Sequence, residues 1–353
     1  MLYPFKFVPV YKDYIWGGRS LIKFGKDLDE GKTAESWELS CHPDGVSIIN
    51  NGKYKGNTLI SMLDTYSNEI AGDLPESKST SFPLLIKLID ANDKLSVQVH
   101  PDDEFAQIHE GELGKNEMWY ILDAKPDAKL IYGLKPGVTR EVFENAVKEN
   151  SLQDCLNYIE VKAGDFINIP AGMVHAIGEG IVLAEIQQNS NTTYRIYDYD
   201  RKDSKGNTRP LHLEKALQVI NFQGNNSNLL YKGLEYKTSI EASLKMLVAN
   251  KYFCVEEYRV FSYVEQNTNH TQFHAYVCIE GQGNITYDDG YVSLAKGETV
   301  LVPASIGKYR IEGEVVLLKT YVPDLEKDVF ARLMSLGYTK QAIMDNVGGL
   351  CKY

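Results

Sequence analysis

The stretch LSVQVHPDDEFAQIHEGELGKNE, residues 95–117, decides how this sequence is interpreted. Its first part alternates, with apolar side chains on one face and Ser96, Gln98 and His100 on the other. Inside a small β-barrel the polar face of such a strand can carry ligands into a cavity. Gln98 and His100 are then neighbours on one face, about 7 Å apart along the strand.

A second strand is expected over 116–122, where aromatic and aliphatic residues surround Glu117 near the start. A later stretch, 170–195, supplies His175 and Arg195. We interpret both stretches as one metal site inside a β-barrel. Two His, one Glu and one neutral Gln oxygen are donors that suit zinc and leave a coordination position open. The same donors also accept iron or manganese, so the residues alone do not select among these metals.

Length, composition and net charge indicate which kinds of binding partner the chain can have. The chain has 353 residues, 43% of them hydrophobic, so two domains with sizeable cores are expected. A net charge of −11 argues against a nucleic-acid partner, but it permits a phosphorylated small molecule bound by a local cluster of Lys and Arg. No segment has the length and apolarity of a membrane span, and the N-terminus has no uninterrupted apolar run. The oligomeric state is not set by any of these features.

The cysteines indicate a reducing compartment. There are five of them, an odd number, and no two have the C-x-x-C spacing of a thiolate metal site. Scattered thiols of this kind are typical of cytoplasmic proteins, in which disulfides are rare. We therefore expect a cytoplasmic protein without a disulfide framework.

Local signals divide the chain in two. Residues 139–156 have helical spacing of apolar side chains, with Thr139 as the N-cap. A Gly/Asn/Ser-rich break at 222–229 predicts a domain boundary. The expected domains are 1–228, which contains the candidate site, and 229–353, which is all β until a late helix.

The second domain partly repeats the first. Two short motifs occur in both: Gly-x5-Pro at 164–170 and 297–303, and a Tyr-led apolar triplet at 120–122 and 276–278. Five residues after the proline stands His175 in the first copy and Lys308 in the second. We therefore expect a second barrel of similar design that has no metal ligands.

The spacing Gly-x5-Pro-x-Gly-x2-His, residues 164–175, resembles the second sequence motif of the cupin superfamily. Further segments resemble the type I mannose-6-phosphate isomerases, and in particular their short bacterial branch, which lacks a large helical domain. These segments are LIKLIDANDKLSVQVHPDD, GKNEMWYIL, PAGMVHAIGEG and EIQQNSNTTYRIYDYDR, with IWGG and ESWELS earlier in the chain. The resemblance is dense over 15–201 and faint beyond it.

The resemblance implies a mainly β fold of two cupin-like jelly-roll barrels with a few helices, in which the first barrel carries the metal site. It also implies one Zn²⁺ per chain. The implied site residues are Gln98, His100, Glu117 and His175 as metal ligands, Arg195 as the catalytic arginine, and Lys87, Ser96 and Lys115 as substrate-binding residues.

Two departures from the family pattern concern proton transfer. Enterobacterial and fungal members have His-Lys-Pro-Glu-Met where this chain has Gly-Lys-Asn-Glu-Met at 114–118, and they have Asp at the position of Asn191. Both missing residues have been considered for proton transfer. The base is therefore left open among Glu38, His42, Glu179 and a metal-bound hydroxide.

The expected activity is the reversible isomerisation of mannose 6-phosphate and fructose 6-phosphate through a metal-stabilised enediol(ate). This reaction moves a proton between C1 and C2, next to a carbonyl. A metal can stabilise the developing oxyanion, and Arg195 can do the same or grip the phosphate as a planar fork.

Other readings remain open from the residues. The chain could be another metal-dependent cupin enzyme, such as a dioxygenase or a glucose-6-phosphate isomerase. It could also be a sugar-binding or regulatory cupin that has kept its metal. The lysines and the arginine favour a phosphorylated hexose substrate, because a dioxygenase has no need of phosphate-binding cations.

Overall fold

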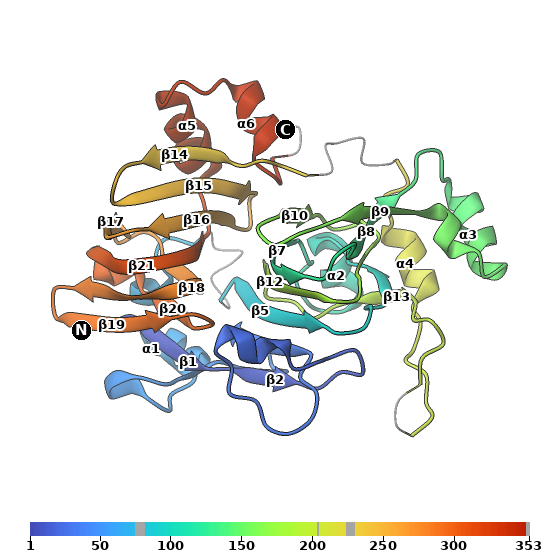
Figure 1. The fold of residues 1–353 in the computed structure, drawn as a ribbon, viewed down its shortest axis with the longest axis horizontal. Helices are drawn as coiled ribbons and strands as arrows, with labels where there is room; N and C mark the ends of the chain where they lie inside the picture. The colour runs from blue at the N-terminus through green and yellow to red at the C-terminus, as the bar shows by residue number, and fades with distance from the viewer. Residues whose placement is uncertain (75–81, 203–204, 224–229, 351–353) are drawn as a thin grey trace.

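The computed structural model of the chain describes residues 1–74, 82–202, 205–223 and 230–350. Strands dominate these residues, and every ladder between the named strands is antiparallel (Figure 1). The predicted mainly β fold is therefore confirmed. The break at 222–229 and the boundary between 228 and 229 lie for the most part outside the described residues, so the domain limits stay a prediction.

The first barrel consists of two sheets with a shared apolar core. Its strands are β2 (Val10–Lys12), β3 (Glu35–Leu39), β5 (Leu84–Ala91), β6 (Val97–Val99), β7 (Glu117–Ala124), β8 (Lys129–Leu134), β9 (Leu156–Glu160), β10 (Phe166–Ile169), β11 (His175–Ile177), β12 (Ile181–Gln188) and β13 (Tyr194–Tyr197). The larger sheet has the order β10-β7-β12-β5-β3-β2, and the smaller one has the order β13-β6-β11-β8-β9. Buried residues of both sheets, such as Ile89 and Leu130, pack in one cluster between them.

The second barrel is built mainly from the last part of the chain. Its strands are β14 (Leu234–Thr238), β15 (Ala242–Ala249), β16 (Cys254–Val260), β17 (Tyr263–Asn267), β18 (His274–Tyr287), β19 (Gly290–Ala295), β20 (Thr299–Val302) and β21 (Lys308–Tyr321). The N-terminal strands β1 (Phe5–Val8) and β4 (Ile48–Ile49) extend the same sheet, because β1 pairs with β20. The start of the chain therefore lies on the second barrel, which a simple division of the sequence at 228 does not anticipate.

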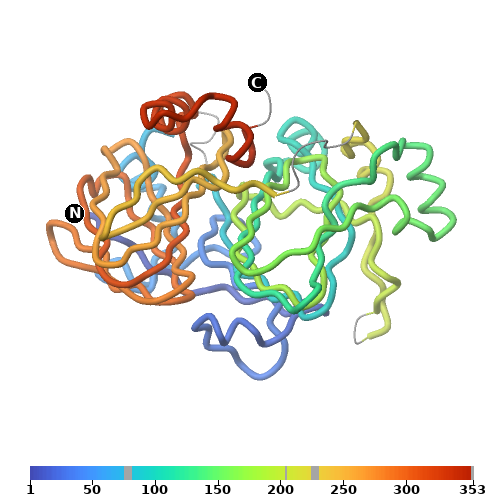
Figure 2. Tube along the Cα trace, turned by 45° about the horizontal axis from the view of Figure 1, so that its top comes forward, coloured from blue at the N-terminus to red at the C-terminus, as the bar shows by residue number. Residues whose placement is uncertain are grey.

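The two barrels lie side by side and share a core (Figure 2). The larger sheet of the first barrel contributes buried side chains such as Ile86 and Met118, and the second barrel contributes Val255 and Leu318. The outer face of β5, β12 and β7 is thus covered by the second barrel. Their inner face remains for the polar residues of the candidate site.

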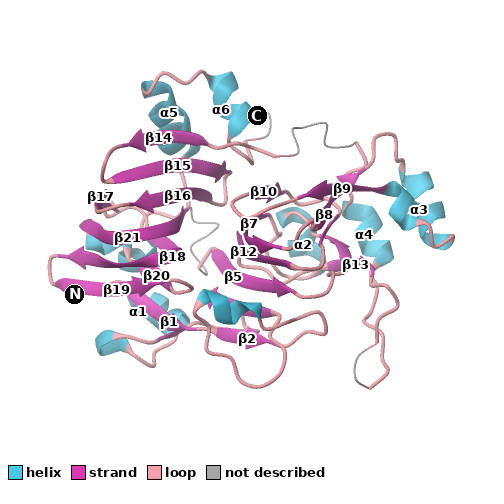
Figure 3. Ribbon diagram, viewed as in Figure 1, coloured by secondary structure: helices cyan, strands magenta, loops and turns pink. Residues whose placement is uncertain are grey.

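Helices are few and lie outside the sheets (Figure 3). They are α1 (Leu59–Ala71), α2 (Asp103–His109), α3 (Arg140–Lys148), α4 (Leu213–Val219), α5 (Arg332–Ser335) and α6 (Lys340–Asn346), with the 3-10 helices η1 (Ser20–Phe24), η2 (Gly52–Tyr54), η4 (Leu152–Cys155) and η5 (Ala304–Ile306) and the π-helix η6 (Leu325–Ala331). Among the described residues, no helix has both the length and the apolarity that crossing a membrane would need.

The predicted helix at 139–156 is shorter than expected. Thr139 caps it, as predicted, by accepting a hydrogen bond from the Val142 N–H. The helix ends at Lys148 because Asn150 adopts a left-handed conformation with φ of 55°, which breaks the helical path. A separate 3-10 helix then follows at Leu152–Cys155.

The strand register gives the relation between the two barrels. Glu117 on β7 pairs with Ile169, the residue before the proline that ends β10. His274 on β18 pairs with Val302, the residue before the corresponding proline after β20. His274 therefore occupies in the second barrel the strand position that Glu117 occupies in the first.

This register corrects the repeat found in the sequence by one residue. Tyr276 corresponds to Trp119 and not to Tyr120, because each pairs with the residue three positions before the proline. Lys308 begins β21 as His175 begins β11, but its side chain is exposed. His175 therefore points into the interior of the first barrel, whereas Lys308 does not point into the interior of the second.

Candidate metal centre

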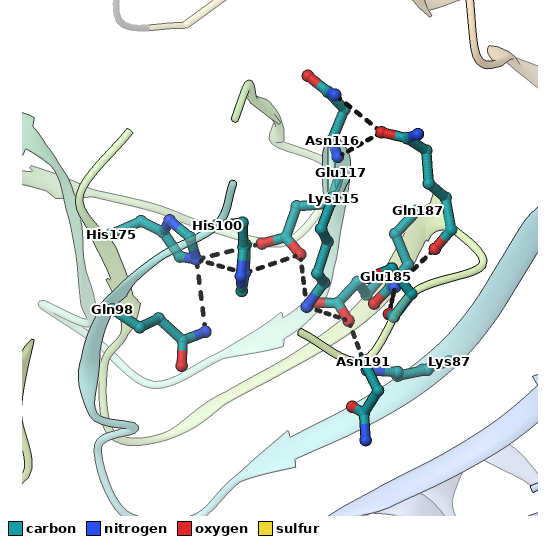
Figure 4. A network of polar contacts seen from close by, with 12 residues as sticks. Lys87, Gln98, His100, Lys115, Asn116, Glu117, His175, Glu185, Gln187 and Asn191 are labelled. Carbon is teal, nitrogen blue, oxygen red and sulfur yellow. Dashed lines mark hydrogen bonds and ion pairs between the residues drawn. The ribbon is translucent and has the colours of Figure 1, made fainter. Parts of the chain in front are cut away.

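Three buried side chains from three strand ends meet inside the first barrel. His100 directly follows β6, Glu117 begins β7 and His175 begins β11. Their donor atoms all lie within 4.8 Å of one another (Figure 4). The two Nε2 atoms are 3.2 Å apart, and the Glu117 oxygens lie 3.5 Å from His100 Nε2 and 3.4 Å from His175 Nε2.

The sheet register explains why Gln98 and Arg195 accompany them. Gln98 on β6 pairs with His175 on one side and with Arg195 on β13 on the other. Directly paired residues of an antiparallel ladder point to the same face, so these three side chains share the interior. Gln98 Nε2 lies 3.4 Å from His175 Nε2. A 180° rotation of the Gln98 side-chain amide would put its oxygen where its Nε2 atom now lies.

Both imidazoles are held with one nitrogen free. His100 Nδ1 donates to the carbonyl of Thr192 (2.9 Å), and His175 Nδ1 donates to that of Met173 (2.8 Å). Burial lowers the pKa of His175 to about 4 and, with the charge of Lys115, the pKa of His100 well below its usual value. Both rings are therefore neutral at physiological pH, and their Nε2 lone pairs point into one space.

The carboxylate of Glu117 adds two more acceptors to this space. Both of its oxygens are buried, and within the described residues neither receives a hydrogen bond of good geometry. Lys115 Nζ lies 3.0 Å from Oε2 as an ionic partner. Burial and the nearby charge of Glu185 raise the pKa of Glu117 to about 7. An enclosed group of nitrogen and oxygen acceptors that converge on one point fits a bound cation, and this donor set is one that zinc takes.

A row of three side chains, two of them charged, crosses the larger sheet beside this cluster. Glu185 on β12 pairs with Lys87 on β5 and with Trp119 on β7, so all three point into the barrel. Glu185 Oε1 lies 3.0 Å from Lys87 Nζ and 3.9 Å from Lys115 Nζ, and Trp119 Nε1 donates to Oε2 at 3.0 Å.

The row keeps its charges despite complete burial. Burial opposes ionisation of Glu185, but Lys87 and Lys115 lower its pKa to about 2. Burial likewise disfavours the charged form of Lys87, yet Glu185 and Glu35 raise its pKa above the usual value. Two ammonium groups and a permanent carboxylate thus stand beside the acceptor cluster.

The remaining predicted residues, Arg195 and Ser96, are neighbours of Gln98 in the sheet and in the chain. Arg195 is half-buried, its Nη1 donates to the Pro210 carbonyl (2.9 Å), and its buried Nε has no hydrogen-bond partner among the described residues. Burial and the neighbouring Arg209 lower the pKa of Arg195. Ser96 is buried next to Gln98, with its Oγ 3.4 Å from the amide oxygen.

Two of the side chains considered as the base do not face the site. Glu179 is 62% exposed in the turn after β11, beside Lys125, so its inclusion was wrong. Glu38 points to the opposite face of β3, where it forms a buried ion pair with Lys26 (2.6 Å). His42 is buried in an edge contact with the ring of Trp37, and Lys87 Nζ lies 5.2 Å from the centre of that ring.

Sequence reasoning missed Glu185 and Glu35. Glu185 interrupts the apolar run IVLAEIQQ at 181–188, and a carboxylate within such a strand is a signal that could have identified it. Glu35 accepts from Trp37 Nε1 (2.7 Å) and lies 3.7 Å from Lys87 Nζ. Nothing in its local sequence distinguishes it from an exposed strand residue.

Two jelly-roll-like barrels, one of them with a buried His–Glu–His cluster and paired lysines, define a two-barrel cupin protein with a candidate metal centre. The description "Phosphomannose isomerase type I, catalytic domain" matches residues 4–130, and "Mannose-6-phosphate isomerase, cupin domain" matches residues 243–322.

Relatives with these names cover most of the chain. It is 40% identical over 312 residues to the mannose-6-phosphate isomerase ManA of Bacillus subtilis, covering 88% of this chain and 96% of that protein. It is 39% identical to the mannose-6-phosphate isomerase of Streptococcus mutans, covering 87% of this chain and 94% of that protein. The chain therefore belongs to the type I mannose-6-phosphate isomerase family.

Solved structures agree with this assignment. The mannose 6-phosphate isomerase of Bacillus subtilis superposes with a TM-score of 0.84 at 35% identity, covering 90% of this chain and 99% of that one. A phosphomannose isomerase from Salmonella typhimurium superposes with a TM-score of 0.72 at 14% identity, covering 91% and 100%, and shares the fold.

Proposed function

We propose that this chain catalyses the reversible isomerisation of mannose 6-phosphate and fructose 6-phosphate. The observation that carries the proposal is the buried cluster of His100, Glu117 and His175, with Lys87 and Lys115 beside it, in a chain of this family. Metal-binding groups next to lysine side chains suit a substrate that has both a carbonyl to polarise and a negative charge.

The proposed metal ligands are Gln98, His100, Glu117 and His175, and the proposed metal is one Zn²⁺ per chain. When bound, this ion supplies Lewis-acid polarisation of the sugar carbonyl. Support comes from the two imidazoles, whose Nδ1 atoms are held by backbone carbonyls while their Nε2 atoms lie 3.2 Å apart, and from the buried carboxylate of Glu117, which lies within 3.5 Å of both.

The second barrel is proposed to hold no metal. In the part of the chain that the structure describes, one cluster of three or more potential ligands of this kind is present. At the position of Glu117 the second barrel has His274, whose Nδ1 is 2.6 Å from the Tyr309 hydroxyl. Lys308, at the position of His175, points outward.

The chain's own residues are proposed to act on the sugar as follows. Lys87, Ser96 and Lys115 bind the substrate through an ammonium, a hydroxyl and a second ammonium. Arg195, opposite Gln98 in the ladder, stabilises the oxyanion of the enediol(ate) as a planar donor. Glu185 stays ionised beside both lysines, 3.0 Å from Lys87 Nζ and 3.9 Å from Lys115 Nζ.

We also propose that the chain works in the cytoplasm on this phosphorylated hexose, without a nucleic-acid or membrane partner. The net charge of −11 supports the exclusion of nucleic acid. Four cysteines in the described residues are free and buried, which suits a reducing compartment.

A coupled assay tests the function. Purified chain should convert mannose 6-phosphate to fructose 6-phosphate, and treatment with a chelator should abolish the conversion. Glucose 6-phosphate serves as the competing substrate. Faster turnover of glucose 6-phosphate would contradict the proposed specificity, and binding of mannose 6-phosphate without any turnover would indicate a sugar-binding cupin instead.

A further inference from the structure

Asp103 joins the two segments that supply the candidate metal ligands. It is the first residue of α2 and stands three residues after His100. Its Oδ1 accepts hydrogen bonds from the Gly114 N–H (3.0 Å) and from Gln188 Nε2 (2.8 Å). The end of the His100 strand is thereby tied to the segment that leads into Lys115.

Gln188 continues this connection on the far side of Lys115. Its Oε1 accepts from both the backbone N–H (2.9 Å) and the side-chain Nδ2 (2.8 Å) of Asn116. Asn116 Oδ1 in turn accepts from the Ala171 N–H (3.1 Å), four residues before His175. Lys115 is therefore flanked on both sides by residues whose backbone is fixed by side chains.

The packing leaves this segment little freedom. A Cβ added at Gly114 would lie 2.4 Å from backbone atoms of Asp102 and Asp103, so the two segments are in direct backbone contact. Lys115 N–H also donates to the Pro101 carbonyl (3.0 Å). A shift of Asp103 would therefore move the backbone that carries Lys115.

The second barrel reaches into the same network. Tyr252 lies in the turn between β15 and β16, and its hydroxyl donates to Asp103 Oδ2 at 2.7 Å. The turn is itself ordered, because Asn250 Oδ1 accepts from the backbone N–H groups of Tyr252 (2.8 Å) and Phe253 (3.0 Å).

We propose that Asp103 and Tyr252 are positioning residues for the isomerase reaction, and that through them the second barrel sets the place of Lys115 beside Glu117. The inference rests on the proposed function, since Lys115 matters only if it acts on a substrate. It gives the second barrel a role in catalysis although it contributes no side chain to the cluster.

Three variants separate positioning from charge. Asp103→Ala removes all three hydrogen bonds. Asp103→Asn keeps them, because its oxygen can accept from Gly114 and Gln188 while its amide donates to the Tyr252 hydroxyl. Tyr252→Phe removes the contact from the second barrel alone.

Steady-state kinetics with mannose 6-phosphate, normalised to bound metal, give the main readout. Asp103→Ala should lower kcat by about 10- to 100-fold, and kcat/KM by at least as much, because Lys115 contacts the substrate and a misplacement of about 1 Å costs up to about 10²-fold. Tyr252→Phe should lower kcat several-fold, and Asp103→Asn should stay close to the wild type. The double variant Asp103→Asn/Tyr252→Phe should be worse than either single variant, because the amide then lacks its acceptor.

Matched controls exclude a general loss of structure. Asp102 caps the same helix, because its Oδ1 accepts a hydrogen bond from the Phe105 N–H (2.9 Å). Asp102→Ala removes this cap but leaves the side-chain contacts of Asp103. Tyr338→Phe removes a hydroxyl that donates to the Glu235 carbonyl (2.8 Å) within the second barrel. Both controls should keep the wild-type kcat and KM.

Hydrogen exchange provides a readout that does not depend on turnover. The amides of Gly114 and Asn116 should exchange faster in Asp103→Ala and, to a lesser extent, in Tyr252→Phe, while β18 and β21 keep their protection. Wild-type kcat in Asp103→Ala and Tyr252→Phe, equal losses in Asp103→Asn and Asp103→Ala, or unchanged exchange at Gly114 would each overturn the inference. A wild-type chain without isomerase activity would contradict the proposed function, and the exchange data would still decide the positioning.

Discussion

At the residue scale, the candidate centre is an arrangement of acceptors without matching donors. His100 and His175 use their Nδ1 atoms for backbone carbonyls, and Glu117 is fully buried without a hydrogen bond of good geometry from the described residues. Buried acceptors of this kind cost stability unless a cation satisfies them. The proposed metal would satisfy these acceptors, which Lys115 approaches from one side alone at 3.0 Å from Glu117 Oε2.

Replacement of either histidine tests this arrangement. His100→Ala or His175→Ala should lose the bound metal and lower kcat by more than about 10³-fold, because each removes one of few strong ligands. Elemental analysis of the purified variants gives the metal content, and His270→Ala, at an exposed loop position, is the control. Full occupancy with normal turnover would contradict the ligand assignment.

Arg195 allows a distinction between two roles. If it stabilises the transition state, Arg195→Ala should lower kcat by about 10²–10³-fold, as for the loss of one preorganised oxyanion donor. If it only grips the phosphate, KM should rise while kcat holds. Arg195→Lys should rescue poorly, because it keeps the charge but loses the planar fork.

Steady-state kinetics on both variants, with metal content measured first, decide the matter. Arg140→Ala, on the surface of α3, is the control for loss of an arginine. A kcat/KM close to wild type in Arg195→Ala would show that this arginine has a structural role alone.

At the element scale, the row Lys87–Glu185–Trp119 shows how three paired strands bring charge into an apolar sheet. Each member stands directly opposite the next in the ladders of β5, β12 and β7, so the register alone aligns them. The same strands bury Ile86 and Met118 on their other face against the second barrel. The charges are therefore held in place by the packing behind them.

The pKa of Glu185 predicts how this row responds to acid. In the folded chain it is about 2, below the ordinary 4.5, so between these values the unfolded chain binds the extra proton. The stabilisation from Glu185 is therefore present above pH 4.5 and is lost as the pH falls toward 2.

Denaturant unfolding between pH 5 and 3 measures this effect. The wild type should lose stability more steeply on acidification than Glu185→Gln. Glu179→Gln, an exposed carboxylate, should keep the wild-type slope. Parallel slopes for the wild type and Glu185→Gln would show that the row is not charged as described.

Local patterns could predict much of this fold, and the misses have physical causes. The alternation of 95–100 predicted a strand because the period of a strand is local, and the barrels were implied by the resemblance that the Gly-x5-Pro spacing carries. Glu179 was wrongly considered and Glu185 was missed, because only strand pairing decides which carboxylate points inward. Local sequence patterns also could not predict the pairing of β1 with β20, because these strands are far apart in the chain.

At the scale of the whole molecule, the two barrels have different interiors. In the second, Glu256 accepts from Tyr236 (2.8 Å), Tyr321 (3.0 Å) and Arg332 (2.9 Å), so its buried charge is satisfied by the protein. In the first, the acceptors of the His–Glu–His cluster are not satisfied in this way. The buried charge of one barrel is satisfied by its own side chains, and the other barrel holds the proposed metal and substrate site.

The measurement that tests the central claim most directly is a zinc titration of metal-stripped chain, with the rate of fructose 6-phosphate formation from mannose 6-phosphate as the readout. The stripped chain should be inactive, and the rate should rise linearly and stop at one zinc per chain, because one barrel is arranged for metal. Full activity in the stripped chain, or a rate that reaches its plateau at two zinc ions per chain, would contradict this account.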